Sequence, residues 1–268
     1  MPIQSQHLPM SFEAWELLPY QPGWKHEYWD GRAHITPTHQ TAVTTAPVTP
    51  RPVNAPCVLR QILPEDEVPL LAVYMEAFAD NQAFCDYTDA EFLDAARSDL
   101  RKSFTGHRAP LLAASRVAVA TEATGAQLVG AALLSRDREY GPMLDLLFIR
   151  PAWQRRGLAT ALVASAMNAL HQAGEGTLTS CYQLANSASQ AWHRGFGFVE
   201  RPDLRYAHAY HRRAQQELFR REKARGLTAA ERAALHADVQ YWHDQVEALE
   251  RLAEAQGYRA VNPRPPHW

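Results

Sequence analysis

Residues 142–170 read PMLDLLFIRPAWQRRGLATALVASAMNAL, and this stretch decides the fold. Its first part, Met143 to Ile149, is an apolar run that predicts a strand, and Pro151 ends the run. A basic turn, Gln154 to Ala159, follows. From Thr160 onward the apolar residues recur at the spacing of one helical face, at Leu162, Ala166 and Leu170. The stretch therefore predicts a strand, a glycine-containing turn and a helix in direct succession.

The predicted turn lies at the N-terminus of the predicted helix. There the first backbone amides lack partners within the helix, and the helix dipole directs partial positive charge outward. Such a terminus can bind phosphate through backbone N–H groups. Gly157 allows close approach of an anion or a positive φ, and Arg155 and Arg156 add positive potential. The turn is thus predicted to bind a pyrophosphate; an ordinary strand-to-helix turn with solvated arginines is the alternative. No GxxxxGK(S/T) or GxGxxG motif competes in this stretch.

The order Gln/Arg-x-x-Gly-x-Gly/Ala, directly after an apolar strand and a proline, resembles the acetyl-CoA-binding motif of the GNAT N-acetyltransferase superfamily. Gln154, Arg156, Gly157 and Ala159 fall on the signature positions, with Ala159 in place of the commoner last glycine. The resemblance implies acetyl-CoA as acyl donor and no metal. It also implies a set of CoA-binding residues, namely Phe148, Ile149, Gln154, Arg155, Arg156, Gly157, Leu158, Ala159, Thr160 and Asn186.

The order of the other predicted elements extends this resemblance from a motif to a domain. Strands are predicted at 57–63, 111–120, 127–135 and 178–182, and helices from 64 to 78 and from 89 to 104. This order is expected of the GNAT fold, an α/β (α+β) architecture with a mixed central sheet flanked by helices. The domain is therefore expected at residues 57–212.

The segment Asn186 to Phe198 resembles the second signature of the superfamily, an asparagine followed by a short helix and a terminal Gly-Phe. Asn186 is expected to start the helix and to direct its amide at the pantetheine arm. In many members a tyrosine four residues before that glycine protonates the departing thiolate. Here His193 holds this position, and an imidazole can donate a proton near neutral pH. A histidine that only packs is the alternative.

Two further groups on the organising strand are candidates for the chemistry. The backbone amide of Ile149 could polarise the thioester carbonyl. Asp145, expected on the face shared by Leu147 and Ile149, resembles acidic residues that deprotonate the amine in some members; ordinary salt-bridge duty is the alternative. The resemblance implies direct attack of a primary amine, from a small molecule or a peptide, on the acyl donor. Nearby acidic residues that would favour a cationic amine are Asp80, Asp86, Asp137 and Glu139.

The first 37 residues predict a small separate module. Ser11 is expected to cap a short helix, and Asp30-Gly31 is a strong signal for a β-hairpin turn. This piece resembles the opening of Uma2-type endonuclease-like proteins, through Gly23, Trp24, Glu27, Asp30 and Gly31. The later acidic and lysine motif of nucleases has no counterpart here, so the module is interpreted as a packing module. Residues 38–56, rich in proline and threonine, are interpreted as a linker, with an extended strand as the alternative.

The end of the chain predicts a strand at 204–210, a helical hairpin at 213–257 and a tail at 258–268. Thr228 and Glu231 form a capping box at the start of the second helix. That helix carries an apolar seam of Leu235, Val239, Trp242, Val246 and Leu249. The seam is expected to pack within the chain, with a homodimer as the alternative.

Composition limits the function classes. The chain has 268 residues and a formal net charge of −2, which argues against nucleic acid or an anionic membrane as the main partner. No run has the length of a membrane span, and no signal peptide is recognised. Three scattered cysteines suggest a reducing cytoplasm. A non-catalytic acyl-CoA-binding module and an interaction protein built on the two terminal pieces remain as alternatives to an N-acetyltransferase.

Overall fold

The structure is a computed structural model that describes residues 5–38, 40–81, 84, 87–106, 109–122, 125–138, 140–224 and 227–255. These residues form two compact units. The sheet unit contains Val43–Tyr182 and Ala188–Glu200. The terminal unit contains the described parts of Gln4–Ala42, Gln183–Ser187 and Arg201–Trp268. Each unit is described by itself below.

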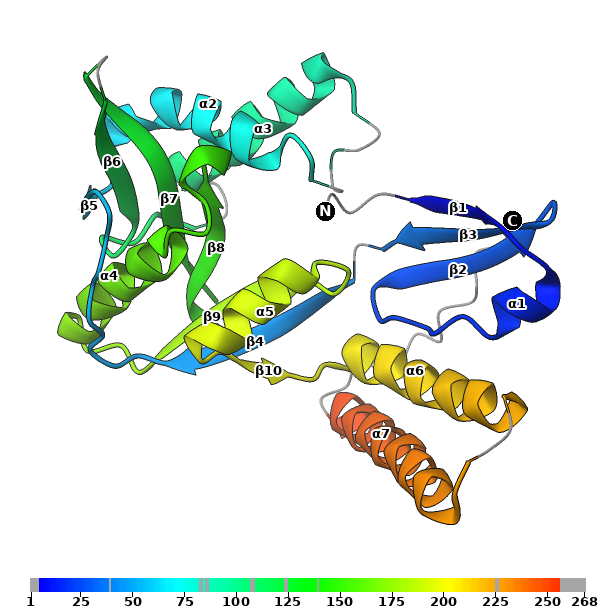
Figure 1. The fold of residues 1–268 in the computed structure, drawn as a ribbon. Coiled ribbons are helices and arrows are strands. Elements are labelled where there is room, and N and C mark those ends of the chain that lie inside the picture. Colours follow the sequence, from blue (N-terminus) through cyan, green and yellow to red (C-terminus); the bar gives the residue numbers. More distant parts are fainter. Residues whose placement is uncertain are drawn as a thin grey trace. The chain divides into compact units, whose positions relative to one another are not determined.

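The sheet unit is built on a seven-stranded sheet with the order β10-β4-β9-β8-β7-β6-β5 (Figure 1). Strands β5 to β8 pair antiparallel with their neighbours, whereas β8 and β9 pair in parallel. The predicted mixed sheet is therefore confirmed. The strand bounds are β4 Thr41–Pro47, β5 Val58–Gln61, β6 Arg116–Glu122, β7 Gly125–Asp137, β8 Gly141–Ile149, β9 Thr177–Gln183 and β10 Val199–Arg201.

Helices cover both faces of this sheet. Helices α2 (Glu67–Phe78) and α3 (Asp89–Phe104) pack on one face, and α4 (Leu158–Gln172) and α5 (Ser187–Phe196) pack on the other (Figure 1). Short 3-10 turns precede α2 at Pro64–Asp66 (η1) and α4 at Pro151–Trp153 (η3). In β7, Leu133 belongs to the core under α2 and α3, while Leu134 belongs to the core under α4. Because successive strand residues face opposite sides, a strand buried on both faces reads as the continuous apolar run seen in the sequence.

For residues 41–47 the interpretation as a linker is wrong, and the alternative, an extended strand, is confirmed. They form β4, which lies beside β9 in the sheet. Ala42, Thr44 and Ala46 are buried in alternation with more exposed neighbours, and the Thr44 hydroxyl donates a hydrogen bond to the Ser180 carbonyl oxygen at 3.0 Å. The alternation was present in the sequence, but alanine and threonine give it little hydrophobic contrast, and the prolines that flank it favour a non-sheet interpretation.

The terminal unit begins with a three-stranded sheet and a short helix. The elements are β1 (Gln6–Pro9), α1 (Phe12–Glu16), β2 (Trp24–Trp29) and β3 (Arg32–Pro37), with the strand order β1-β3-β2. The predicted hairpin is confirmed: Asp30 and Gly31 have φ angles of 50° and 69°, as a two-residue turn of this kind requires. The predicted cap is also present, since Ser11 accepts a hydrogen bond from the Ala14 amide at 3.2 Å.

The second part of the terminal unit is a pair of helices, α6 (Leu204–Lys223) and α7 (Ala229–Ala255), drawn in yellow to orange in Figure 1. The prediction of a strand at 204–210 is wrong. Asp203 caps α6 by accepting a hydrogen bond from the Tyr206 amide at 2.7 Å, and the rings of Tyr206 and Tyr210 stack at 4.3 Å on one helical face. Tyrosines four residues apart fit both a strand and a helix, and the cap decides for the helix.

The predicted capping box of α7 is confirmed by the reciprocal hydrogen bonds between Thr228 and Glu231. The predicted seam packs within the chain, where the Trp242 ring contacts the rings of Tyr206 and Tyr210 on α6. The predicted tail at 258–268 lies outside the described residues. Across the described helices, none combines the length and the apolar character that a membrane crossing demands.

Candidate functional site

The turn between β8 and α4 has the backbone of an anion-binding turn. Gly157 is the N-cap of α4 with φ 78° and ψ 2°, and Arg155 also has a positive φ of 58°. Left-handed residues in such a turn orient several amides toward one side. A side chain at Gly157 would meet no atom within 4 Å, so the space in front of the helix N-terminus is open. An anion can therefore reach the first amides of α4.

Side chains around this turn hold it in place and leave its donors accessible. The Gln154 side-chain amide donates to the Ile149 carbonyl oxygen at 3.0 Å, which ties the turn to the end of β8. The Arg156 guanidinium lies over the Trp153 ring at 5.2 Å. Leu158 is only 1% exposed and anchors the helix in the core, so only its backbone can serve a ligand. The segment 154–160 contains no carboxylate, and these donors fit the pyrophosphate of CoA.

Strands β8 and β9 pair only briefly. The parallel register joins Met143 to Thr179 and Leu144 to Ser180, and no further pair of these two strands follows in the described residues. The register of β8 against β7 shifts at Asp145, which is the extra residue of a β-bulge. The two strands therefore diverge from Asp145 onward, at the carboxyl end of β8 and before the turn.

Beyond the bulge, the backbone amide of Ile149 on β8 points toward the region where β8 and β9 diverge. The Arg150 amide donates to the Val129 carbonyl oxygen of β7 at 2.9 Å. Because hydrogen-bonded and non-hydrogen-bonded pairs alternate in an antiparallel ladder, the pair of Ile149 and Gly130 is the non-hydrogen-bonded kind. The Ile149 amide therefore points away from β7. This direction suits the oxyanion role suggested by the sequence.

The remaining candidates on β8 have different surroundings. Phe148 is 3% exposed and its ring packs against Tyr74 and Phe78, so it can offer only backbone groups to a ligand. Asp145 is exposed at the bulge. The sequence analysis expected Asp145 on the same strand face as Leu147 and Ile149, because side chains alternate between the two faces of a regular strand. The bulge at Asp145 interrupts this alternation.

His193 is buried on α5, with 4% of its surface exposed. Its Nδ1 lies 2.8 Å from the Ser189 carbonyl oxygen, and its Nε2 lies 3.0 Å from the Ser180 hydroxyl oxygen. A carbonyl oxygen only accepts, so Nδ1 carries the proton of the neutral ring and Nε2 accepts from Ser180. Burial lowers the pKa of His193 below its usual 6.5, although the Ser189 bond and the charge of Glu200 act in the opposite direction.

Ser180 is the residue that sequence reasoning missed. It lies on β9 where the pairing with β8 ends, is 2% exposed, and joins His193 to the point of divergence. A single serine within a strand forms no sequence motif, and its partner His193 lies on a different element, α5. Only the fold brings the two side chains together.

Not all predicted site residues fall in the sheet unit. The turn, the end of β8 and His193 do, whereas Asn186 belongs to the terminal unit. The Asn186 amide donates to the Gln183 carbonyl oxygen at 2.8 Å, and α5 begins at the next residue. Of the acidic residues proposed for the acceptor side, Asp80 is exposed, Asp137 accepts from the Tyr140 amide at 2.9 Å, and Asp86 and Glu139 lie outside the described residues.

Comparison with known families identifies the central segment. Residues 87–209 match the family model described as "Acetyltransferase (GNAT) domain". The matched segment is therefore similar to GNAT acetyltransferase domains. It contains β8, the turn before α4, α4 itself and the His193 segment, and the fold predicted from the sequence is confirmed. The match begins at Tyr87, after β5 and α2, which the sequence analysis had placed in the same domain.

Several solved structures are similar to this chain. An aminoglycoside N-acetyltransferase, AAC(6')-Iy in complex with CoA, is 20% identical with a TM-score of 0.40, and the match covers 57% of this chain and 93% of that one. A GCN5-related N-acetyltransferase from Sphaerobacter thermophilus is 18% identical with a TM-score of 0.42, and the match covers 60% of this chain and 48% of that one. A PaiA N-acetyltransferase from Thermoplasma acidophilum in complex with coenzyme A is 16% identical with a TM-score of 0.33, and the match covers 45% of this chain and 75% of that one. No curated protein matches the sequence.

Proposed function

We propose that the protein transfers an acetyl group from acetyl-CoA to a primary amine by direct attack. The observation that carries this proposal is the left-handed turn of Arg155 and Gly157 at the open N-terminus of α4, inside the GNAT domain. It follows a strand that diverges from its parallel neighbour. This combination offers one site for the diphosphate and another for the acyl end of a single extended donor.

In this proposal, residues Gln154 to Thr160 hold the pyrophosphate, with the amides of α4 as donors and the arginines as counter-charges. The backbone of Phe148 and Ile149 holds the pantetheine arm in the divergence. The Ile149 amide points away from β7 and donates to the thioester oxygen as charge develops on it.

The reaction moves one proton from nitrogen to sulfur. As the bond between nitrogen and the acyl carbon forms, the amine loses a proton. As the carbon–sulfur bond breaks, the thiolate leaves and takes a proton from water, so that one proton is transferred overall. Asp145, exposed at the bulge, is the proposed group that receives the amine proton, directly or through water. Holding both substrates in position supplies a further part of the acceleration.

The contacts of His193 support an indirect role for it in this scheme. Its Nε2 accepts from Ser180, so the neutral ring has no proton there to give, and burial opposes a second proton by lowering the pKa. We therefore propose that His193 positions the Ser180 hydroxyl, which lies at the end of the β8–β9 pairing. Direct protonation of the thiolate by His193, as the family resemblance implied, is the alternative that mutagenesis tests below.

The proposal is tested by calorimetric titration of the purified protein with acetyl-CoA and with CoA, followed by an assay of thiol release with a panel of primary amines. Micromolar binding of both nucleotides and amine-dependent thiol release would support the proposal. Binding without thiol release from any amine would favour a non-catalytic acyl-CoA-binding module. An absence of binding would exclude both.

A further inference from the structure

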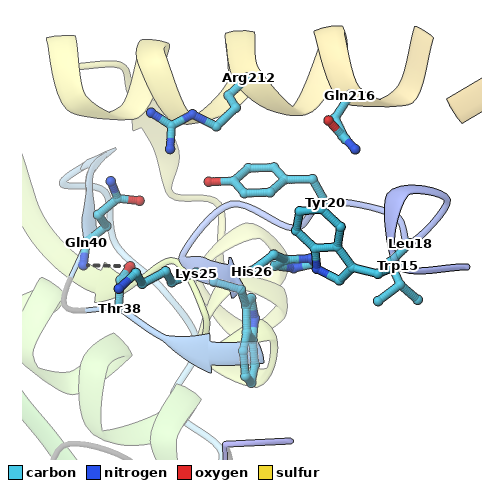
Figure 2. Close-up of a pocket in the computed structure, with 10 residues that line it drawn as sticks. Trp15, Leu18, Tyr20, Lys25, His26, Thr38, Gln40, Arg212 and Gln216 are labelled. Atoms are coloured by element: carbon cyan, nitrogen blue, oxygen red, sulfur yellow. Dashed lines mark hydrogen bonds between the residues drawn. The ribbon is translucent and has the colours of Figure 1, made fainter. Parts of the chain in front are cut away.

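The terminal unit contains a cavity of its own, with a volume of about 420 Å³. Aromatic side chains from α1, from the loop after it and from β2 form its floor, and α6 forms its roof (Figure 2). Its volume is within the range of small-molecule sites in proteins. The proposed transferase reaction makes no use of it.

Contacts between distant parts of the chain hold the walls of this cavity together. The Gln216 side chain of α6 donates to the Glu16 carbonyl oxygen of α1 at 3.3 Å, and Lys223 forms an ion pair with the Glu16 carboxylate. Below the roof, the Tyr20 and His26 rings contact each other with centroids 5.4 Å apart. The cavity is therefore a built feature and not a gap between loose segments.

The polar groups of the cavity are mostly donors. Arg212 and Gln216 are four residues apart on α6, so both point into the cavity, and Figure 2 shows the Arg212 guanidinium directed toward the Tyr20 hydroxyl. Burial raises the pKa of the Tyr20 phenol, while the nearby Arg212 acts in the opposite direction, so the hydroxyl keeps its proton at pH 7. The Trp15 indole nitrogen is buried and has no hydrogen-bond partner among the described residues.

The charge facing the cavity is positive. None of the ten described residues that line it is an aspartate or a glutamate. Lys25 is paired with Glu27 at 2.6 Å, which leaves the Arg212 guanidinium as the main charge. Burial lowers the pKa of His26, so its ring is neutral at pH 7 and serves as an aromatic surface.

We propose that this cavity binds a small planar aromatic anion. The ring of the ligand would lie against Trp15, Tyr20 and His26, and its carboxylate or phosphate would accept hydrogen bonds from Arg212. A guanidinium presents two parallel donors that match either anion, and aromatic walls favour a flat ring.

The test is a calorimetric titration of the full-length protein with indole-3-acetate and with uridine monophosphate, each in the presence of saturating CoA so that the GNAT site is occupied. Binding of at least one, with a dissociation constant on the order of 100 μM, is the expected result for a ligand of this size. Which probe binds distinguishes a carboxylate from a phosphate ligand. Tryptamine has the same ring as indole-3-acetate with a cationic group, and it should bind at least ten times more weakly.

Two neighbouring arginines give a matched pair of variants. Arg212→Gln should weaken binding at least tenfold, whereas Arg213→Gln should not change it, because Arg213 lies over the Tyr210 ring at 5.7 Å and does not line the cavity. The indole N–H resonance of Trp15, assigned by its absence in Trp15→Phe, should shift on binding. The proposal is overturned if neither anion binds at millimolar concentration, if tryptamine binds as well as the anions, or if both arginine variants lose affinity equally.

Discussion

Gly157 opens α4 with a left-handed backbone, and a side chain placed there would project into open space. We expect Gly157→Asp to put a carboxylate beside the pyrophosphate of CoA while the core stays intact. Gly157→Asn is the matched control, because the two side chains share a shape and both tolerate the left-handed region. Each should lower the free energy of unfolding by about 1 kcal/mol.

The size of the effect follows from the charge alone. Two unit charges about 5 Å apart repel each other by about 3 kcal/mol at an effective dielectric constant of about 20. Residues 154–157 are exposed, so solvent and salt reduce the repulsion to about 2 kcal/mol. That figure corresponds to about 30-fold weaker CoA binding for the aspartate than for the asparagine variant.

Calorimetry of CoA binding to the wild type and both variants, at low and at high salt, measures this difference. The ratio of the two dissociation constants should shrink as salt rises, since the repulsion is screened. Equal affinity of the aspartate and asparagine variants at low salt would refute the assignment of the pyrophosphate to this turn. Circular dichroism and thermal unfolding confirm that both variants are folded.

Three further predictions concern other parts of the molecule. His193→Gln and Ser180→Ala should lower turnover less than about 10-fold with CoA affinity unchanged, because His193 acts through Ser180; a loss of about 100-fold or more in thiol release would instead identify a direct proton donor. Burial lowers the pKa of His193 below 6.5, so this histidine takes up a proton at higher pH in the unfolded chain than in the folded one. The free energy of unfolding should therefore fall as the pH drops through 6.5. When the free energy of unfolding is measured with urea between about pH 7.5 and 5.5, it should change less steeply with pH for His193→Gln than for the wild type. An equally steep pH dependence in the variant would contradict this role of His193. Gly23→Ala should lower the free energy of unfolding by at least about 2 kcal/mol more than Gly31→Ala in the same measurement. Both glycines have positive φ, but only at Gly23 would the added carbon lie 2.4 Å from the Ala185 backbone nitrogen, so equal losses would argue against this contact.

Local signals in the sequence predicted the parts of the fold that depend on neighbouring residues. The strand, turn and helix at 142–170, the Ser11 cap, the hairpin turn and the capping box at Thr228 all have their determinants within a few positions. The same holds for the left-handed turn before α4, whose glycine and arginines are adjacent. Such features need no knowledge of the rest of the chain.

Several features that depend on distant partners were predicted wrongly, only as an alternative, or not at all. Strand β4 is stabilised by pairing that joins Thr44 to Ser180, which are 136 positions apart, and its own residues are too small to mark it as buried. The start of α6 carries tyrosines whose spacing is ambiguous until the Asp203 cap is seen. The pair of Ser180 and His193 likewise depends on the meeting of a strand and a helix. In each case the energy that decides the structure comes from contacts that a local pattern does not contain.

The terminal unit joins segments that are far apart in the sequence, and this has a consequence for how the protein folds during synthesis. Glu16 contacts Gln216 and Lys223, which follow it by 200 and 207 residues. The ribosome therefore releases the small sheet long before α6 exists to cover its aromatic side chains. Contacts of such separation make folding slow, because a long loop must close before they form. The cavity under α6 is thus completed only after Gln216 has been made, and a chain that stops before residue 204 would expose the rings of Trp15 and Tyr20 to water.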